Sequence, residues 1–163
     1  MTKLFLDLEE TVINNWDEAL LVKTDKLKTL LWTNPDIDRH DVTIFSFAIY
    51  NQKDKDLFER TMKPMLERTF GIVVTAWPSV AEMAEADQRL TGVRWLDADT
   101  MGGLDICEFI TLRGKAQAFE HWVWLHGEPG GRYLLLDDVV PSRTIYDRRK
   151  DIQIDLINVD RDL

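Results

Sequence analysis

The feature that most constrains the fold of this chain is a series of short apolar runs, each with a polar residue at or near its end. Residues 3–6 stop at Asp7, residues 42–47 contain Ser46, and the leucines of residues 134–136 stop at a pair of acids. Stretches with apolar residues at helical spacing lie between these runs. This alternation predicts an α/β fold with a mainly parallel sheet.

The individual elements can be placed from residue type and spacing. Strands are predicted at residues 3–6, 42–47, 72–76, 106–112, 133–136 and 152–159. The last strand alternates between apolar and polar residues, which suits a position near an edge of the sheet. Helices are predicted at residues 24–32, around 57–66, after Ser79 and at 116–127, with a loop at 91–103. Pro64 should kink or split its helix, and Ser79 and Glu82 have the spacing of a capping box.

Length and charge narrow the class of protein. The chain has 163 residues, the size of one domain, and we expect a single domain over residues 1–163. Its formal net charge of −9 disfavours unaided binding to nucleic acid without excluding it. Cys107 has no second cysteine with which to form a disulfide, and the first apolar run is too short for a signal peptide or a membrane span. We therefore expect a cytoplasmic protein with no membrane partner.

Polar residues recur where predicted strands end and where one predicted helix begins. Asp7, Ser46 and the pair Asp137-Asp138 lie at or just after strand ends, and Lys115 begins a helix. In parallel sheets the carboxyl ends of the strands meet at one edge, where ligands bind in a crevice. A charged residue at the end of an apolar strand needs a partner or a metal, because isolated buried charge is costly. The sequence therefore predicts one polar site at this edge.

Taken in order along the chain, these residues resemble the four motifs of the haloacid dehalogenase (HAD) superfamily of Mg²⁺-dependent phosphohydrolases. The loop Asp7-Leu8-Glu9-Glu10-Thr11 is similar to the nucleophile loop of that family, and residues 137–142 are similar to its fourth motif. The resemblance implies a three-layer, Rossmann-like (HAD-like), mainly parallel sheet with helices on both faces. Residues 12–39 have room for a loop and one helix only, and core elements account for residues 47–114. A capless or minimally capped domain is therefore expected.

The resemblance also implies a role for each motif residue. A phosphatase of this family would use Asp7 as the nucleophile that forms an aspartyl-phosphate, and Glu9 as the acid and base. The phosphoryl group would be bound by Thr11, Ser46 and Lys115, and the cofactor Mg²⁺ by Asp7, the backbone carbonyl of Glu9, Asp137 and Asp138. The expected function is hydrolysis of a phosphomonoester, with a nucleotide or the phosphorylated end of a larger molecule as candidate substrates.

The same residues support other interpretations. The family usually carries Asp where this chain has Glu9, so a catalytically weak or inactive binding protein on the same scaffold is the main alternative. A phospho-accepting receiver domain uses similar residue types, but there the acid pair precedes the acceptor, whereas here it comes last. His40, His121 and His126 show no ligand spacing and are interpreted as structural or surface residues. For Trp77 and Trp95, core packing is favoured over stacking on a base.

Overall fold

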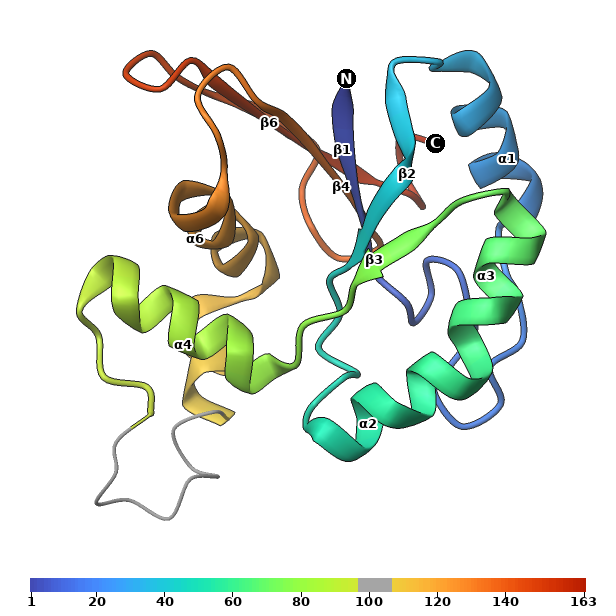
Figure 1. The fold of residues 1–163 in the computed structure, drawn as a ribbon, viewed down its shortest axis with the longest axis horizontal. Coiled ribbons are helices and arrows are strands. Elements are labelled where there is room, and N and C mark those ends of the chain that lie inside the picture. Colours follow the sequence, from blue (N-terminus) through green and yellow to red (C-terminus); the bar gives the residue numbers. More distant parts are fainter. Residues whose placement is uncertain (97–106) are drawn as a thin grey trace.

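The chain folds around one six-stranded mixed sheet with the strand order β3-β2-β1-β4-β6-β5 (Figure 1). The structure is a computed structural model and describes residues 1–96 and 107–163. The strands are β1 (Thr2–Leu6), β2 (Ile37–Ile44), β3 (Val74–Ala76), β4 (Arg132–Asp137), β5 (Arg143–Asp147) and β6 (Ile152–Asn158). Neighbouring strands are parallel except β5 and β6, which are antiparallel. The predicted α/β class with a mainly parallel sheet is therefore confirmed.

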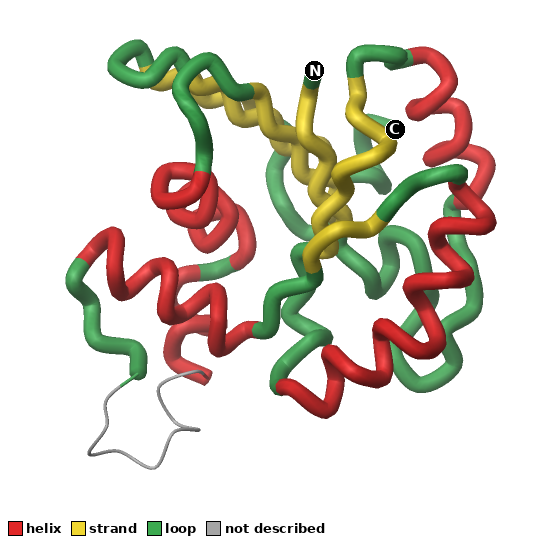
Figure 2. Tube along the Cα trace, in the orientation of Figure 1, coloured by secondary structure: helices red, strands yellow, loops and turns green. Residues whose placement is uncertain are grey.

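Helices lie on both sides of this sheet. They are α1 (Thr24–Thr33), α2 (Gln52–Leu57), the π-helical turn η1 (Phe58–Met62), α3 (Lys63–Phe70), α4 (Val80–Thr91), the π-helical turn η2 (Phe109–Arg113) and α6 (Lys115–His126). Figures 1 and 2 show α4 and α6 on one side of the strands and α1 and α3 on the other.

Alternation along β1 divides the core between two hydrophobic clusters. Leu4 and Leu6 belong to the cluster that includes Leu27 of α1. Phe5, which lies between them, belongs to the second cluster, and its ring centroid is 4.9 Å from that of Phe119 of α6. Successive side chains of a strand point to opposite faces. Both faces of β1 are therefore covered, which explains why its sequence is a nearly continuous apolar run.

The predicted strands are confirmed with shifted boundaries, with one exception. β2 runs from Ile37 to Ile44 and not over residues 42–47, so Ser46 lies in the loop after the strand. β6 is the second strand from one edge of the sheet, as its alternation suggested. The edge strand itself, β5, was not predicted, because its residues are exposed or only half-buried and form no apolar pattern.

The predicted strand at residues 106–112 is wrong. Residues 107–113 are helical and include η2. A short apolar run does not by itself distinguish a strand from a helix. Here Phe109 is fully buried while Leu112 is 70% exposed, so this apolar run is not buried along its whole length. Ile106 and part of the predicted loop at 91–103 lie outside the described residues.

Two local predictions concern helices. Pro64 lies in the first turn of α3, which follows the wider π turn η1 directly, so the helical segment changes its hydrogen-bonding pattern before Pro64 and is not split in two. The capping box at the start of α4 is present: Glu82 N donates to Ser79 Oγ and Ser79 N donates to Glu82 Oε1, both at 3.2 Å. Such a cap satisfies amide groups that the first helical turn leaves unpaired.

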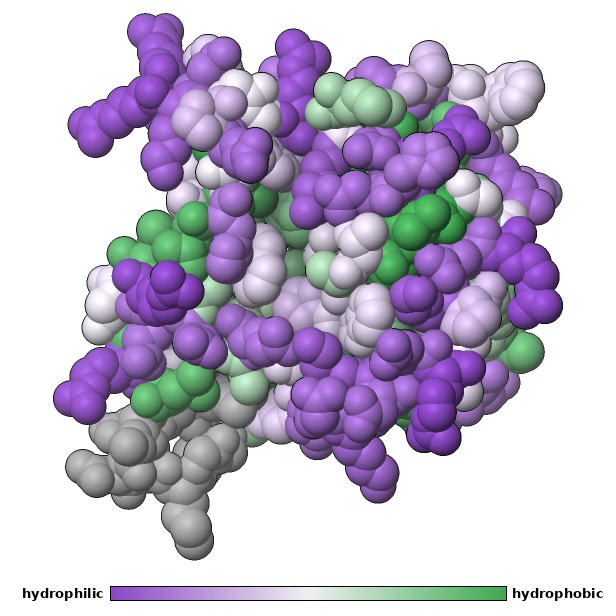
Figure 3. Space-filling view, in the orientation of Figure 1, coloured by the Kyte–Doolittle hydropathy of each residue, from purple (hydrophilic) through white to green (hydrophobic). Residues whose placement is uncertain are grey.

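The face of the molecule seen in Figure 3 is predominantly polar. Hydrophilic residues cover most of the face seen in Figure 3, and hydrophobic residues form small, separate areas on it. Among the described residues, no helix has the length and apolar character needed to cross a bilayer.

Candidate functional site

The register of the central strands brings the first and last motifs together. Leu6 of β1 pairs with Ile44 of β2 on one side and with Leu136 of β4 on the other. Asp7 N donates to the Leu136 carbonyl at 3.0 Å, and Phe45 N donates to the Leu6 carbonyl at 2.8 Å. Three adjacent parallel strands therefore end at the level of Asp7, which is the edge where parallel α/β sheets bind ligands.

Lys115 places its ammonium group between two of the carboxylates. It begins α6 after Gly114, whose φ of 75° is readily adopted only by glycine. Lys115 Nζ lies 2.9 Å from Asp7 Oδ1 and 3.1 Å from Asp137 Oδ2, and all three side chains are buried. Burial alone would lower the pKa of Lys115, but the carboxylates of Asp7 and Asp137 outweigh it and raise that pKa above its ordinary value. Lys115 is therefore a cation throughout the physiological pH range.

Asp138 adds a third carboxylate to this group. One side-chain oxygen from each of Asp7, Asp137 and Asp138 lies within 4.8 Å of the other two. Burial, together with the charges of Asp7 and Asp137, raises the pKa of Asp138 to about 6. At neutral pH three carboxylates thus share one ammonium group, which leaves an excess of negative charge at the site.

This set of donors fits a hard divalent cation. Asp137 Oδ1 accepts a hydrogen bond from Val139 N at 2.8 Å. Asp137 Oδ2 is buried and, within the described chain, accepts no hydrogen bond of acceptable geometry, although Lys115 Nζ is 3.1 Å away. Its contact with Lys115 is thus an ion pair, and the oxygen keeps lone pairs for a further ligand. Mg²⁺ binds oxygen ligands, usually one or two carboxylates with several waters, so Asp7, Asp137 and Asp138 suit it.

The chain turns sharply after Asp7. The Leu8 carbonyl accepts hydrogen bonds from all three amides of residues 11–13. Glu10 has a φ of 61°, in the left-handed region that residues with side chains seldom adopt. Thr11 is fully buried, and its Oγ1 donates to Asp7 Oδ2 at 3.3 Å. Thr11 therefore contacts one oxygen of Asp7 while Lys115 contacts the other, so the carboxylate is held from both sides.

Ser46 lies in a segment that packs against Lys115. It is 1% exposed and follows β2 directly after Phe45. The rings of Phe45 and Phe47 have their centroids 5.9 and 5.0 Å from Lys115 Nζ. Ser46 Oγ accepts a hydrogen bond from Ala48 N at 3.2 Å, and its own hydrogen can still be donated to a ligand. The two residues that flank Ser46 in the sequence thus place their rings near the same ammonium group.

Glu9 is a predicted site residue whose carboxylate the structure turns away from the other carboxylates. Its Oε2 accepts a hydrogen bond from Trp16 N at 2.8 Å, so the carboxylate is turned toward the loop that follows. It is absent from the described carboxylates that approach within 4.8 Å of one another. The predicted contact of its backbone carbonyl with a metal stays a prediction.

Asn158 belongs to the site but was not predicted from the sequence. It is 4% exposed and pairs with Asp137 across β4 and β6. Its Nδ2 donates to the carbonyls of Asp138 and Val140, both at 3.0 Å, and so fixes the loop that carries the acid pair. The sequence did contain a signal for it, since Asn158 is a polar residue at the end of a predicted strand, the same criterion that identified Asp137.

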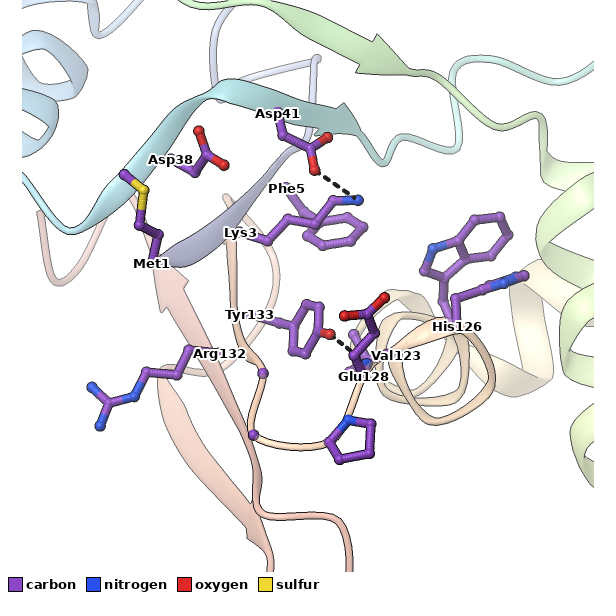
Figure 4. Close-up of a pocket in the computed structure, with 15 residues that line it drawn as sticks. Met1, Lys3, Phe5, Asp38, Asp41, Val123, His126, Glu128, Arg132 and Tyr133 are labelled. Atoms are coloured by element: carbon purple, nitrogen blue, oxygen red, sulfur yellow. Dashed lines mark hydrogen bonds and ion pairs between the residues drawn. The ribbon is translucent and has the colours of Figure 1, made fainter.

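A hollow at the opposite end of the strands is separate from this site. It is lined from the amino-terminal ends of β1 and β4, with Lys3 and Tyr133 around it (Figure 4). Lys3 forms an ion pair with Asp41 at 3.7 Å, and the Tyr133 hydroxyl accepts a hydrogen bond from the Glu128 amide at 2.7 Å. These groups are already paired with one another, and we assign no chemistry to them.

The structure thus brings most of the predicted residues to one edge of the sheet and turns the side chain of one away. Asp7, Thr11, Ser46, Lys115 and Asp137 are buried polar residues at one edge of the sheet. Asp138 is half-buried beside them, and the side chain of Glu9 is turned away. Comparison of the chain with protein-family models, curated proteins and solved structures finds no match.

Proposed function

We propose that this chain is a Mg²⁺-dependent phosphohydrolase that cleaves phosphomonoesters through an aspartyl-phosphate on Asp7. The observation that carries the proposal is the contact of Lys115 Nζ with both Asp7 and Asp137, at 2.9 and 3.1 Å, beside a third carboxylate. Phosphoryl transfer depends mainly on positioning and on neutralising charge on the phosphoryl oxygens. The buried ammonium group of Lys115 and the nearby cation site would neutralise this charge, and the contacts that hold the Asp7 carboxylate would position it.

In the proposed reaction Asp7 is the nucleophile. One carboxylate oxygen of Asp7 bonds to phosphorus while the bond from phosphorus to the leaving oxygen breaks. The leaving oxygen takes a proton from Glu9, and Glu9 then takes a proton from the water that attacks the phosphorus of the aspartyl-phosphate. This second attack releases phosphate and restores the carboxylate, so each ester consumes one water. Glu9 must first leave the Trp16 amide that it contacts at 2.8 Å.

The other residues bind and orient the phosphoryl group. Lys115 offsets the negative charge of the phosphoryl oxygens, and Ser46 donates a hydrogen bond to one of them. Thr11 holds Asp7 Oδ2 at 3.3 Å and limits rotation of the carboxylate. Asp7, Asp137 and Asp138, with the backbone carbonyl of Glu9, would hold Mg²⁺. When bound, Mg²⁺ supplies Lewis-acid stabilisation of the charge on the phosphoryl oxygens.

The proposal extends to the HAD-like, three-layer, capless architecture and to a cytoplasmic location. Phe58 and Leu66 of the helical segment after β2 belong to one core cluster, and Met83 of α4 belongs to the other. These helices therefore pack on the sheet, which supports a chain without a separate cap over the described residues. A hollow lined by residues 113–117 and 139–141 borders the start of α6, beside the loop that follows Asp137 and Asp138. A capless site would suit a nucleotide or a phosphorylated end of a larger molecule.

Phosphate release from an aryl phosphate and a panel of nucleotides, with Mg²⁺ and with EDTA, tests this function. We expect turnover that requires Mg²⁺ and is abolished by Asp7→Asn, because the amide is a poor nucleophile. Asp25→Asn is the matched control, since Asp25 is an exposed acid in the first turn of α1. Equal turnover in Asp7→Asn and wild type would contradict the assignment of the nucleophile.

The contact between Glu9 and Trp16 favours a second candidate, a phosphate-binding or metal-binding protein with little or no turnover. Glu9 is one methylene longer than the Asp usual in the family, and misplacing a catalytic group by about 1 Å can cost roughly a hundredfold in rate. The variants Glu9→Gln and Glu9→Asp separate the two candidates. A phosphatase adapted to Glu9 loses activity in both. A binding protein retains Mg²⁺ affinity and lacks turnover in wild type and in Glu9→Gln, whereas a gain in Glu9→Asp indicates an impaired ancestral site.

A further inference from the structure

Outside the candidate site, Asp87 of α4 is a buried carboxylate with an unusually complete set of partners. It is 1% exposed. Its Oδ1 accepts hydrogen bonds from Trp95 Nε1 at 2.9 Å, Arg113 Nη2 at 3.1 Å and Thr91 Oγ1 at 3.2 Å. Its Oδ2 lies 2.6 Å from His121 Nδ1 and 3.0 Å from Arg113 Nε. Burial alone would raise the pKa of Asp87, but hydrogen bonds from Trp95 and His121 and the charges of His121 and Arg113 lower it.

Stability alone does not account for this cluster. Replacing a buried ion pair by well-packed apolar residues is often neutral or stabilising, so a packing contact between α4 and α6 does not require charge. A charged network does fix the relative orientation of the segments that it joins, because its hydrogen bonds are directional. Asp87 joins three segments: the end of α4, the residues around Trp95, and the stretch from Arg113 to His121.

That last stretch carries Lys115. Arg113 is the last residue of η2, Gly114 has φ 75° and ψ 165°, and Lys115 is the first residue of α6. The start of α6 has no side-chain cap. The guanidinium of Arg113 is fixed by Asp87, and its Cζ also lies 5.2 Å from the centroid of the Trp95 ring. Asp87 therefore restrains the chain immediately before Lys115 and, through His121, further along the same helix.

The position of Lys115 leaves a role for such a restraint. Lysine has a flexible four-carbon stem, and an uncapped first helical turn tends to fray. Its ammonium group nevertheless has to lie between two carboxylates at 2.9 and 3.1 Å. We infer that Asp87 is a positioning residue that fixes Lys115 at the start of α6 through Arg113. The effect of Asp87 on turnover rests on the proposed function, whereas its effect on the position of Lys115 does not.

The variant Asp87→Asn tests the inference with little change in shape. The amide oxygen can keep the contacts made by Oδ1, but the amide nitrogen would place N–H groups against the Nε–H of Arg113. The readout is competitive acylation of lysine amines in the folded protein, with peptide mass spectrometry comparing Lys115 with Lys26, an exposed lysine of α1. Lys115 should react about tenfold faster in Asp87→Asn than in wild type, because the ion pair that fixes Arg113, and through it Lys115, has been lost.

Two further variants make the result decisive. Arg113→Gln removes the proposed link at a half-buried residue and should raise Lys115 labelling as Asp87→Asn does, with no further rise in the double variant. Met62→Ala, in the other core cluster, matches a general loss of stability and should leave Lys115 labelling unchanged. If Lys115 labels in Asp87→Asn and Arg113→Gln no faster than in Met62→Ala, the inference is overturned.

The same variants separate this inference from the proposed function. If wild type hydrolyses phosphomonoesters, Asp87→Asn should lower kcat by up to about a hundredfold, the cost of misplacing a catalytic group by about 1 Å. KM should rise as well, because Lys115 also binds the phosphoryl group in the proposed reaction. If wild type shows no hydrolysis, the proposed function fails, and the labelling of Lys115 still decides the role of Asp87.

Discussion

Replacing Lys115 with methionine removes the cation that lies among the three carboxylates of the site while keeping an unbranched side chain. The side chains of Asp7 and Asp137, which contact Lys115 Nζ, are only 9% and 0% exposed. Removing one partner of a buried ion pair typically costs about 3–5 kcal/mol, because the remaining charge is left uncompensated in the interior. We therefore expect the free energy of unfolding of Lys115→Met to fall by about 3–5 kcal/mol at neutral pH without Mg²⁺.

The same contacts determine how the free energy of unfolding of wild type and of Lys115→Met depends on pH. In wild type the raised pKa of Lys115 contributes stability that is fully present below the ordinary lysine value of 10.5 and is lost only at more alkaline pH. In Lys115→Met the buried carboxylates lack this cation, so the folded protein binds protons more tightly than the unfolded chain does. The stability of the variant relative to wild type should therefore rise as the pH falls from neutral, and Mg²⁺ should restore part of it at neutral pH.

Urea unfolding at about pH 7 and pH 5, with and without Mg²⁺, measures these effects directly. Lys63→Met is the matched control, because the ion pair of Lys63 with Glu67 at 3.4 Å joins partly exposed side chains on one helix. That pair should contribute only about 0.3–0.5 kcal/mol. A loss below about 1 kcal/mol in Lys115→Met, with no recovery at lower pH or with Mg²⁺, would refute the reasoning.

Three other predictions concern the acidic loop and the fold. Burial and the charges of Asp7 and Asp137 raise the pKa of Asp138 to about 6. Mg²⁺ should therefore bind about tenfold more weakly for each pH unit below that value. Calorimetry that finds the same Mg²⁺ affinity at pH 5 and pH 8 would contradict this. Asn158→Ala removes two hydrogen bonds of 3.0 Å and should lower the free energy of unfolding by about 1–3 kcal/mol. It should also weaken Mg²⁺ binding. Titration with urea measures the first effect, and titration with Mg²⁺ measures the second. Ser79→Ala removes one half of the capping box of α4 and should cost about 1 kcal/mol in urea unfolding while leaving Mg²⁺ affinity unchanged.

Local patterns in the sequence were sufficient to predict most of the sheet and the edge at which polar residues gather. Asp7 and Asp137 end apolar strands, and strands that pair in parallel bring such residues to one level of the sheet. Lys115 could be added because it begins a helix behind a glycine. The structure brings these three side chains together across a separation of more than one hundred residues along the chain.

The parts that the sequence did not predict depend on tertiary contacts. The segment at residues 106–112 is apolar enough for a strand, and packing of Phe109 with the second core cluster accompanies its helical conformation. β5 has no apolar pattern because it lies at the sheet edge. Asp87 gave no signal either, since a single acid in an amphipathic helix is usually exposed; its burial follows from partners on α6 and near Trp95.

In the proposed reaction Asp7 carries the phosphoryl group during turnover. This is tested by quenching the reaction in acid during turnover, reducing it with borohydride, and mapping the peptide that contains Asp7 by mass spectrometry. Borohydride reduces an aspartyl-phosphate to homoserine, so we expect homoserine at position 7, formed only when substrate and Mg²⁺ are both present. Release of phosphate with no homoserine at position 7, or with homoserine at another aspartate, would contradict it.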